Sequence, residues 1–332
     1  MKAIIPVAGA GTTLRPHTHT HPKPLIPVAG KPILGHIIDN LMEAEVRELI
    51  FVVGYLEEKI RGFVEEYARE KGFIAHFVRQ EPRRGLAHAI NLCKAAIADV
   101  NEVIITLGDT IVDTNLKELA QAEESLLCVQ QVDEPWEYGI AVEGEDGYIR
   151  SLVEKPSIPK SNLALVGLYK IVDVPSLMQA TDYLIENDIR TRGEFQLTDA
   201  LDYMVQNGAR MRVQRVNNWF NCGKKEVLLQ TNRLLLKKME QHSLRNYPQS
   251  IILPPVFLPE NVVIEHSIVG PNVAVGENAV IRNSLVSDSI LGAYSSLESV
   301  ILKESVIGND TRLVGRGHSI NIGDNTELDF NT

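Results

Sequence analysis

A glycine-rich loop and a lysine follow the first apolar run of the chain. The run KAIIPV leads into Gly9 and Gly11, and Lys23 stands further along between two prolines. Glycine leaves backbone N–H groups open to a phosphate because it has no side chain to block the approach. A residue before a proline is pushed to extended geometry, so Lys23 is presented from a stiff loop. The spacing predicts a phosphate site, with a plain turn and a solvated lysine as the alternative.

The loop fits neither of two common glycine motifs for nucleotides. The dinucleotide fingerprint needs a third glycine where Leu14 stands. The P-loop needs Gly-Lys-Ser/Thr where Leu14, Arg15 and Pro16 stand. Hydride transfer and P-loop ATP hydrolysis are therefore both disfavoured.

A carboxylate follows another apolar run. Asp109 comes directly after EVIITL and Gly108. Mg²⁺ is a hard cation that prefers one or two carboxylates together with substrate phosphates, so Asp109 is a candidate magnesium ligand. An aspartate that merely starts a turn is the alternative.

Short β-rich runs alternate with helical patterns up to about residue 240. The runs are KAIIPV, ELIFVVG, IAHFVRQ, EVIITLGD, LLCVQQV, GIAV and MRVQRV, and the amphipathic segments include 31–45, 56–72, 85–98 and 224–243. This alternation predicts an α/β fold with a mostly parallel sheet, in which ligands gather at the carboxyl ends of the strands. The rule selects the glycine loop, Asp109 and the loop 217–225.

Beyond residue 245 the apolar residues recur every six positions. The series contains Ile251, Phe257, Val263, Val269, Val275 and Ile281, then Leu291 with Leu297 and Ile307 with Leu313, and five-residue steps through Val286 and Leu302 bridge the gaps. Such a period predicts a β-helix of hexapeptide repeats, with ordinary strands and turns as the alternative. We therefore expect two domains, residues 1–243 and 244–332.

Composition and charge narrow the class of protein. The 332 residues are 44% hydrophobic and 23% charged, with a formal net charge of −10. An acidic chain repels polyanions, so neither nucleic acid nor an anionic membrane is expected as a partner. The three cysteines are widely spaced, and no run of about 18 apolar residues occurs. We expect a cytoplasmic protein.

Eight motifs in a fixed order give a family resemblance. They are GAGTTLRPHTHTHPKPLIPVAGKPIL, RQEPRRGLAHAI, TLGD, YGIAV, VEKP, VGLY, GEFQLTD and WFNCG. The chain resembles the sugar-phosphate nucleotidyltransferases, most closely the long glucose-1-phosphate thymidylyltransferases with a C-terminal left-handed β-helix. The resemblance implies a Rossmann-like mixed α/β sheet followed by a left-handed parallel β-helix that assembles the chain into a homo-oligomer.

The resemblance also implies a reaction. The phosphate oxygen of a sugar 1-phosphate would attack the α-phosphorus of a nucleoside triphosphate, forming a nucleoside diphosphate sugar and releasing pyrophosphate. The expected substrates are dTTP or UTP with glucose 1-phosphate, and Mg²⁺ is the expected cofactor. Two anions must meet, so the site must supply cations and positioning.

Site residues follow from the resemblance position by position. The expected triphosphate and base ligands are Gly9, Gly11, Thr12, Gln80 and Gly85, and the expected catalytic cations are Lys23 and Arg15. The expected sugar-phosphate pocket contains Gly139, Glu154, Lys155, Leu165, Tyr169 and Glu194. The expected metal ligands are Asp109 and Asn221.

Two residues depart from the family pattern. Thr13 stands where the family loop has an arginine, and Asn221 stands where the thymidylyltransferases have an aspartate. Losing one contact to the transition state typically costs about 10² to 10³ in rate, and Arg15 is the candidate to replace it. The alternative is a catalytically weak or silent homologue that binds a sugar nucleotide and regulates a partner.

A group of three histidines and one single histidine carry weaker hypotheses. His17, His19 and His21 alternate and could bind Zn²⁺ or Ni²⁺ from one face of an extended segment. His318 could serve as the base of an acyltransferase site in the β-helix, but subunit assembly is the preferred role of that domain.

Overall fold

The computed structural model describes residues 1–239 and 245–315. The chain divides into two compact units, residues 1–231 and residues 232–332. The domain boundary predicted between residues 243 and 244 lies outside the described residues. None of the described helices is long and apolar enough to cross a membrane.

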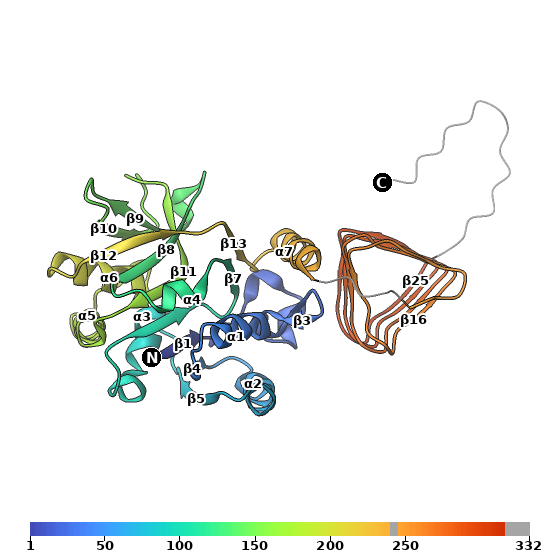
Figure 1. Cartoon of the computed structure of the whole chain (residues 1–332), viewed down its shortest axis with the longest axis horizontal. Helices are drawn as coiled ribbons and strands as arrows, with labels where there is room; N and C mark the ends of the chain where they lie inside the picture. Colours follow the sequence, from blue (N-terminus) through green and yellow to red (C-terminus); the bar gives the residue numbers. More distant parts are fainter. Residues whose placement is uncertain (240–244, 316–332) are drawn as a thin grey trace. The chain divides into compact units, whose positions relative to one another are not determined.

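A nine-stranded sheet forms the centre of the first unit (Figure 1). The strand order is β10-β9-β11-β6-β1-β4-β5, and β8 pairs with both β11 and β12. The strands are β1 (Lys2–Pro6), β4 (Glu48–Val53), β5 (Ile74–Arg79), β6 (Val103–Thr106), β8 (Ser125–Gln131), β9 (Gly139–Glu143), β10 (Ile149–Glu154), β11 (Leu163–Ile171) and β12 (Met211–Arg215). All seven β-rich runs predicted from the sequence form strands of this sheet.

The sheet is mixed because β10 and β11 run in the opposite direction to the other strands. Strands β1, β4, β5 and β6 are parallel, whereas β11 runs antiparallel to β6, β8 and β9. Successive side chains of a strand point to opposite faces. Ile4 and Ile5 are both 0% exposed, so both faces of the sheet are covered.

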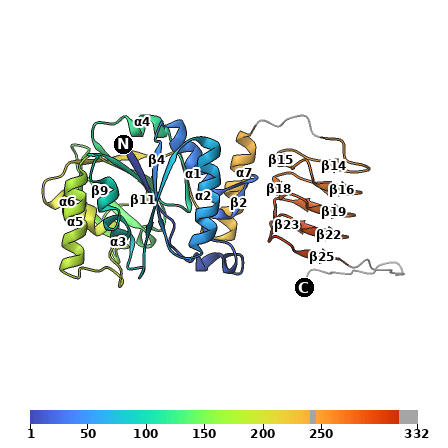
Figure 2. The same ribbon diagram turned by 90° about the horizontal axis from the view of Figure 1, so that it is seen from below.

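Helices cover the two faces of the sheet. They are α1 (Ile33–Glu43), α2 (Glu57–Lys71), α3 (Leu86–Asn91), α4 (Leu116–Ala120), α5 (Val174–Glu186) and α6 (Leu197–Gln206). Figure 2 shows α5 and α6 on one side of the strands, with α1 and α2 on the other. The predicted segments 31–45, 56–72 and 85–98 are therefore helical, the last one continuing as a short 3₁₀ turn, η4 (Lys94–Ile97).

The helix predicted over 224–243 is α7 (Lys225–Lys238). It begins in the first unit and ends in the second. Residues 240–243 of that prediction lie outside the described residues.

Short elements connect the sheet to the predicted site. Three 3₁₀ turns follow β1, namely η1 (Thr12–Leu14), η2 (His17–His19) and η3 (Lys23–Leu25). They are followed by the two-stranded pair β2 (Pro27–Val28) and β3 (Lys31–Pro32). A second small antiparallel sheet joins β7 (Thr110–Asp113) to β13 (Asn218–Asn221), and η5 (Pro135–Glu137) precedes β9.

The second unit is a left-handed β-helix of three parallel sheets, seen end-on as a triangle in Figure 1. One sheet contains β14 (Ile251–Ile252), β17 (Ile268–Val269), β20 (Leu285–Ser287) and β23 (Ile301–Lys303). The next contains β15 (Val256–Phe257), β18 (Val273–Val275), β21 (Ile290–Leu291) and β24 (Val306–Ile307). The third contains β16 (Val263–Glu265), β19 (Val280–Arg282), β22 (Ser296–Glu298) and β25 (Arg312–Val314).

The six-residue register is correct for most of the β-helix and wrong in its first coil. Val269, Val275 and Ile281 are almost fully buried inside the prism, as are Val286, Leu291 and Leu297, while the later members Leu302, Ile307 and Leu313 are partly buried against the same core. Ile251 and Val263, however, are 56% and 37% exposed. Their neighbours Ile252 and Ile264 contribute to the core instead, because each coil takes its register from the coil stacked on it.

One face of the β-helix has an outward row of aliphatic side chains. Ile251, Ile268, Leu285 and Ile301 pair in register along the sheet that begins with β14. Ile301 is 81% exposed and Leu285 is 39% exposed. We call these four residues the aliphatic ladder.

Candidate active site

The glycine loop is built tightly against Lys23. Gly11 has φ +58°, and a Cβ atom there would lie 2.8 Å from Lys23 Cβ and 3.2 Å from Thr18 Cγ2. Thr18 Oγ1 also donates a hydrogen bond to Gly11 O at 2.8 Å. A side chain at position 11 would push the lysine stem away, so this position requires glycine.

The ammonium group of Lys23 joins the two predicted metal ligands. Its Nζ forms an ion pair with the Asp109 carboxylate and donates to Asn221 Oδ1 at 3.4 Å. Only 10% of the Lys23 side chain is exposed. The small β7–β13 sheet holds these groups together, because Asn221 pairs with Thr110 and Cys222 N donates to Asp109 O at 3.1 Å.

A cavity of about 430 Å³ opens between the glycine loop and the start of α3. Seven of the residues predicted for the site line it: Gly9, Gly11, Lys23, Gln80, Gly85, Asp109 and Glu194. Arg83 and Leu107 are among the other lining residues. Thr12 and Arg15 do not line the cavity, and both side chains are exposed on the η1 turn. Their assigned roles remain predictions.

The predicted base-reading residues both line this cavity and bond to each other. Gln80 Nε2 donates to Gly85 O at 2.9 Å and lies 3.2 Å from His88 Nδ1. Burial, together with the nearby positive charge of Arg84, lowers the pKa of His88. The imidazole is therefore neutral near pH 7, and a neutral polar pair suits the edge of a base better than a phosphate.

A second group of predicted residues gathers around Gly139 at the start of β9. A Cβ atom at Gly139 would lie 2.9 Å from Glu154 Oε2, 3.2 Å from Leu165 Cδ1 and 2.7 Å from Thr198 Oγ1. Thr198 Oγ1 donates to Glu154 Oε2 at 2.7 Å. Tyr169 is fully buried, and burial and the nearby Glu154 carboxylate raise its pKa well above the usual range. The group offers a carboxylate and a hydroxyl, which are typical partners of sugar hydroxyls.

Lys155 follows Glu154 directly and is held by its backbone. Its N–H donates to Tyr138 O at 3.0 Å, and its carbonyl accepts from Arg192 Nη2 at 3.3 Å. The residue has φ +44°. Glu194, predicted for the sugar pocket, lines the cavity of the glycine loop, and its assigned role remains a prediction.

The oxygen atoms around Lys23 suit Mg²⁺. Asp109 supplies a carboxylate and Asn221 an amide oxygen, both within reach of one point, and Mg²⁺ prefers a few such hard donors completed by phosphates and water. In the described part of the chain, no group of three or more His, Cys, Asp or Glu side chains could hold a metal ion. The alternating histidines 17, 19 and 21 therefore form no such group, and His318 lies outside the described residues.

Two further polar residues at the site were not predicted from the sequence. Arg83 lines the cavity, and Thr198 bonds to Glu154. Both lie in motifs that the sequence does contain, QEPRRGLA and GEFQLTD. The first motif contains a basic residue and the second contains a hydroxyl, and these residue types were the only signals in the two motifs. Whether either side chain reaches the site depends on how the loops fold.

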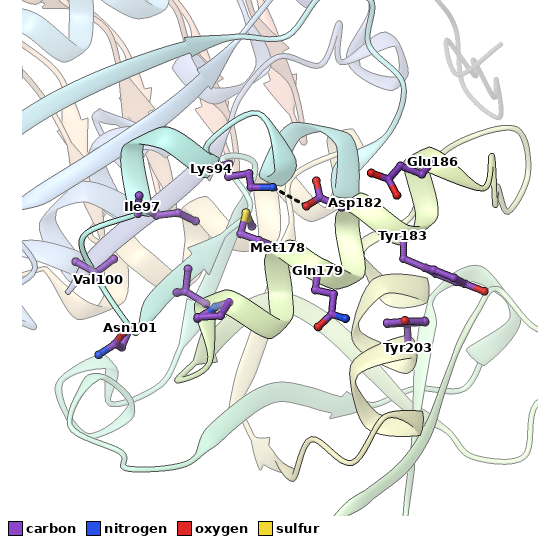
Figure 3. Close-up of a pocket in the computed structure, with 13 residues that line it drawn as sticks. Lys94, Ile97, Val100, Asn101, Met178, Gln179, Asp182, Tyr183, Glu186 and Tyr203 are labelled. Carbon is purple, nitrogen blue, oxygen red and sulfur yellow. Dashed lines mark hydrogen bonds and ion pairs between the residues drawn. The ribbon is translucent and has the colours of Figure 1, made fainter.

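A separate cavity of about 610 Å³ lies on the α5 side of the first unit (Figure 3). Its lining includes Lys94, which pairs with Asp182 at 2.6 Å. Tyr183 and Tyr203 stack beside it with ring centroids 4.3 Å apart. None of the residues predicted for the site lines this cavity.

Comparisons with known proteins agree with the fold. The model of the nucleotidyl transferase family matches residues 2–238, and the chain belongs to this family. A bifunctional protein GlmU from Methanococcus vannielii is 34% identical over 321 residues, which cover 95% of this chain and 73% of that protein.

Two relatives come from Haloferax volcanii. The UTP–glucose-1-phosphate uridylyltransferase AglF is 32% identical over 66% of this chain and 89% of its own length. The low-salt glycan biosynthesis nucleotidyltransferase Agl11 is 33% identical over 71% of this chain, and the match spans 66% of that protein. A crystal structure of a UDP-glucose pyrophosphorylase complexed with UDP-glucose covers 72% of this chain and 99% of its own, with a TM-score of 0.60 and 24% identity, and so shows the fold.

Proposed function

We propose that the chain is a Mg²⁺-dependent sugar-1-phosphate nucleotidyltransferase, with dTTP or UTP and glucose 1-phosphate as the best candidate substrates. One observation carries this proposal. A single cavity is lined by the glycine backbone, Lys23, Asp109 and the Gln80–Gly85 pair. Lys23 also donates to Asn221. A triphosphate with a base at one end and a metal at the other needs this set of groups.

The proposed reaction exchanges one phosphoanhydride bond for another. An oxygen of the sugar 1-phosphate forms a bond to the α-phosphorus, and the bond from that phosphorus to the bridging oxygen of the β-phosphate breaks. The electron pair leaves with pyrophosphate, so no proton has to move. Lys23 binds the phosphates, and Gln80 and Gly85 hold the base. Positioning and charge supply most of the catalysis in such a transfer.

The second group of residues binds the sugar phosphate in this proposal. Glu154, held by Thr198, accepts hydrogen bonds from sugar hydroxyls, and Lys155 pairs with the phosphate. Asp109 and Asn221 would hold Mg²⁺, which when bound neutralises charge on the phosphate oxygens. Lys23 pairs with Asp109 in the ligand-free protein and changes partner when substrate binds.

A second candidate function is a catalytically weak or silent sugar-nucleotide-binding homologue. The observation that favours it is the position of Arg15, which does not line the cavity. Arg15 therefore does not replace the arginine that the family has at the position of Thr13. Binding without turnover is the property that separates this candidate from an enzyme.

We also propose that the second unit joins copies of the chain into a homo-oligomer. The aliphatic ladder supports this, because three of its four side chains, Ile251, Leu285 and Ile301, are exposed in one row, and a row of exposed aliphatic side chains is typical of an interaction surface. The three cysteines are free and buried, which supports a reducing compartment such as the cytoplasm.

The test of the activity is pyrophosphate release in the presence of Mg²⁺. A panel of four nucleoside triphosphates and several sugar 1-phosphates is assayed with the wild type, Asp109→Ala and the surface variant Asp146→Ala. Turnover with one pair, reduced at least about 10²-fold by Asp109→Ala and unchanged by Asp146→Ala, is expected. Nucleotide binding without turnover on any pair would favour the silent homologue instead.

A further inference from the structure

The cavity contains a second cation to which the proposed mechanism gives no role. Arg83 lines the cavity together with Lys23 and Gly9. Its Nη1 atom lies 3.5 Å from the carbonyl oxygen of Ala8, the residue before Gly9. The guanidinium group therefore reaches from the Gln80–Gly85 loop across to the glycine loop, where a triphosphate would lie between the base and the metal ligands.

The charge balance of the cavity makes Arg83 important for an anionic ligand. The charged side chains in the lining are Lys23, Arg83, Asp109 and Glu194. The ammonium group of Lys23 is already neutralised by Asp109. A triphosphate brings about four negative charges, and without Arg83 the lining would carry a net negative charge that repels it. Arg83 brings the formal charge of the lining to zero before any metal arrives.

The guanidinium group of Arg83 is also free to bind. Its contact at the glycine loop is a neutral carbonyl, and no ion pair of Arg83 with a carboxylate occurs within residues 1–239 and 245–315. The neighbouring arginines are engaged elsewhere. Arg84 lies over the Phe195 ring at 5.2 Å, and Arg79 pairs with Glu81 at 2.5 Å.

We propose that Arg83 is a catalytic residue that binds the phosphates of the nucleoside triphosphate and stabilises the departing pyrophosphate. This inference rests on the proposed nucleotidyltransferase function. As the bond to the bridging oxygen breaks, negative charge grows on the β-phosphate. A guanidinium group donates two parallel N–H bonds to such oxygens and keeps its charge at every working pH. Arg83 thus supplies from the Gln80–Gly85 loop the cation that the glycine loop lacks at Thr13.

The test compares four variants in the pyrophosphate-release assay: Arg83→Ala, Arg83→Lys, Arg15→Ala and the matched surface control Arg150→Ala. The Arg150 side chain pairs with Asp146 at 2.8 Å and is 62% exposed. Arg83→Ala should lower kcat/KM about 10²- to 10³-fold, with most of the loss in kcat, and Arg83→Lys should recover part of it. Arg15→Ala should lower kcat/KM less than Arg83→Ala does, and Arg150→Ala should stay close to the wild type.

A binding measurement separates this inference from the proposed function. Inorganic tripolyphosphate is titrated calorimetrically into the wild type and Arg83→Ala without metal, and the variant should bind about tenfold more weakly or worse. Equal rates and equal tripolyphosphate affinities for the two proteins would overturn the role of Arg83. A loss of rate in Arg15→Ala with none in Arg83→Ala would overturn it as well. A wild type that binds tripolyphosphate through Arg83 but turns over no substrate pair would contradict the proposed function alone.

Discussion

Gly85 stands where two segments of the first unit approach each other closely. Its φ is +113°, and a Cβ atom there would lie 2.4 Å from Phe195 O and 2.7 Å from Phe195 N. Both atoms take part in hydrogen bonds, since Ala87 N donates to Phe195 O at 2.9 Å and Phe195 N donates to Arg84 O at 2.9 Å. Gly85→Ala must therefore push the segments apart and break both bonds.

The size of the effect follows from these contacts. A non-glycine residue in a disfavoured backbone region costs about 1–3 kcal/mol. Each of the two lost hydrogen bonds adds about 1 kcal/mol. We expect the free energy of unfolding to fall by about 3–5 kcal/mol, and Tm to fall by roughly 6 °C or more for a unit of this size. Nucleotide binding should weaken too, because Gln80 donates to the Gly85 carbonyl.

The assay is urea and thermal unfolding of Gly85→Ala beside a matched control, Gly147→Ala. Gly147 has φ +77°, but nothing lies within 4 Å of a Cβ atom built there. The control variant has the backbone strain but no steric clash with a neighbouring segment. Its free energy of unfolding should therefore fall by only about 1 kcal/mol. Equal stability losses in the two variants would refute the close approach at Phe195 as the reason for a glycine at position 85.

Three further predictions concern groups away from the cavity. Lys170→Met should lower the free energy of unfolding by about 2 kcal/mol or more in urea titrations, because the fully buried ammonium bonds to a carboxylate at 2.5 Å and a carbonyl at 2.9 Å. Burial raises the pKa of Cys93 and Cys128 to about 12, so native protein should not react with a thiol reagent at pH 8. Thiols of the unfolded protein ionise at a lower pH than the buried thiols of the folded protein. The free energy of unfolding should therefore fall as pH rises above about 9. Leu285→Lys with Ile301→Lys should lower the oligomer mass measured by light scattering.

Each of these predictions has a contrary outcome. Unchanged urea midpoints in Lys170→Met would show that the buried ion pair adds nothing to stability. Rapid labelling of native thiols would mean that the cysteines are accessible. For the aliphatic ladder, Val314→Lys is the control, since Val314 is 55% exposed but lies on another sheet. An oligomer lost in the control alone would place the contact elsewhere.

The sequence predicts the parts of the fold that depend on local patterns. The runs that form β1, β4 and β6 are mostly apolar because these strands are buried on both faces. A run of this kind predicts a strand from the sequence alone. Strand β11 is equally apolar, but its antiparallel place between β6 and β8 depends on pairing over long distances in the chain. Its direction is therefore a property of the whole sheet.

The candidate site divides in the same way. Lys23 stands between two prolines and Asp109 follows a glycine, so both residues could be selected from the sequence. In the structure their side chains form an ion pair. Arg15 is only two residues from Thr13, yet η1 turns it to the surface, whereas Arg83 reaches the glycine loop from far along the chain. Loop geometry decides which arginine faces the cavity, and neither composition nor spacing encodes that geometry directly.

The stacking of the β-helix makes its length modular. Ile268 stands 17 residues after its partner Ile251, and Leu285 stands 17 residues after Ile268. Removing residues 268–284 would place Leu285 next to Ile251 in the sheet. The turn that follows would then lie over the matching turn of the coil before it. Each coil stacks on the coil before it, so such a protein would keep its sheet faces in alignment while becoming one layer shorter. The height of the prism can thus change in whole coils without any change in the chemistry of the first unit.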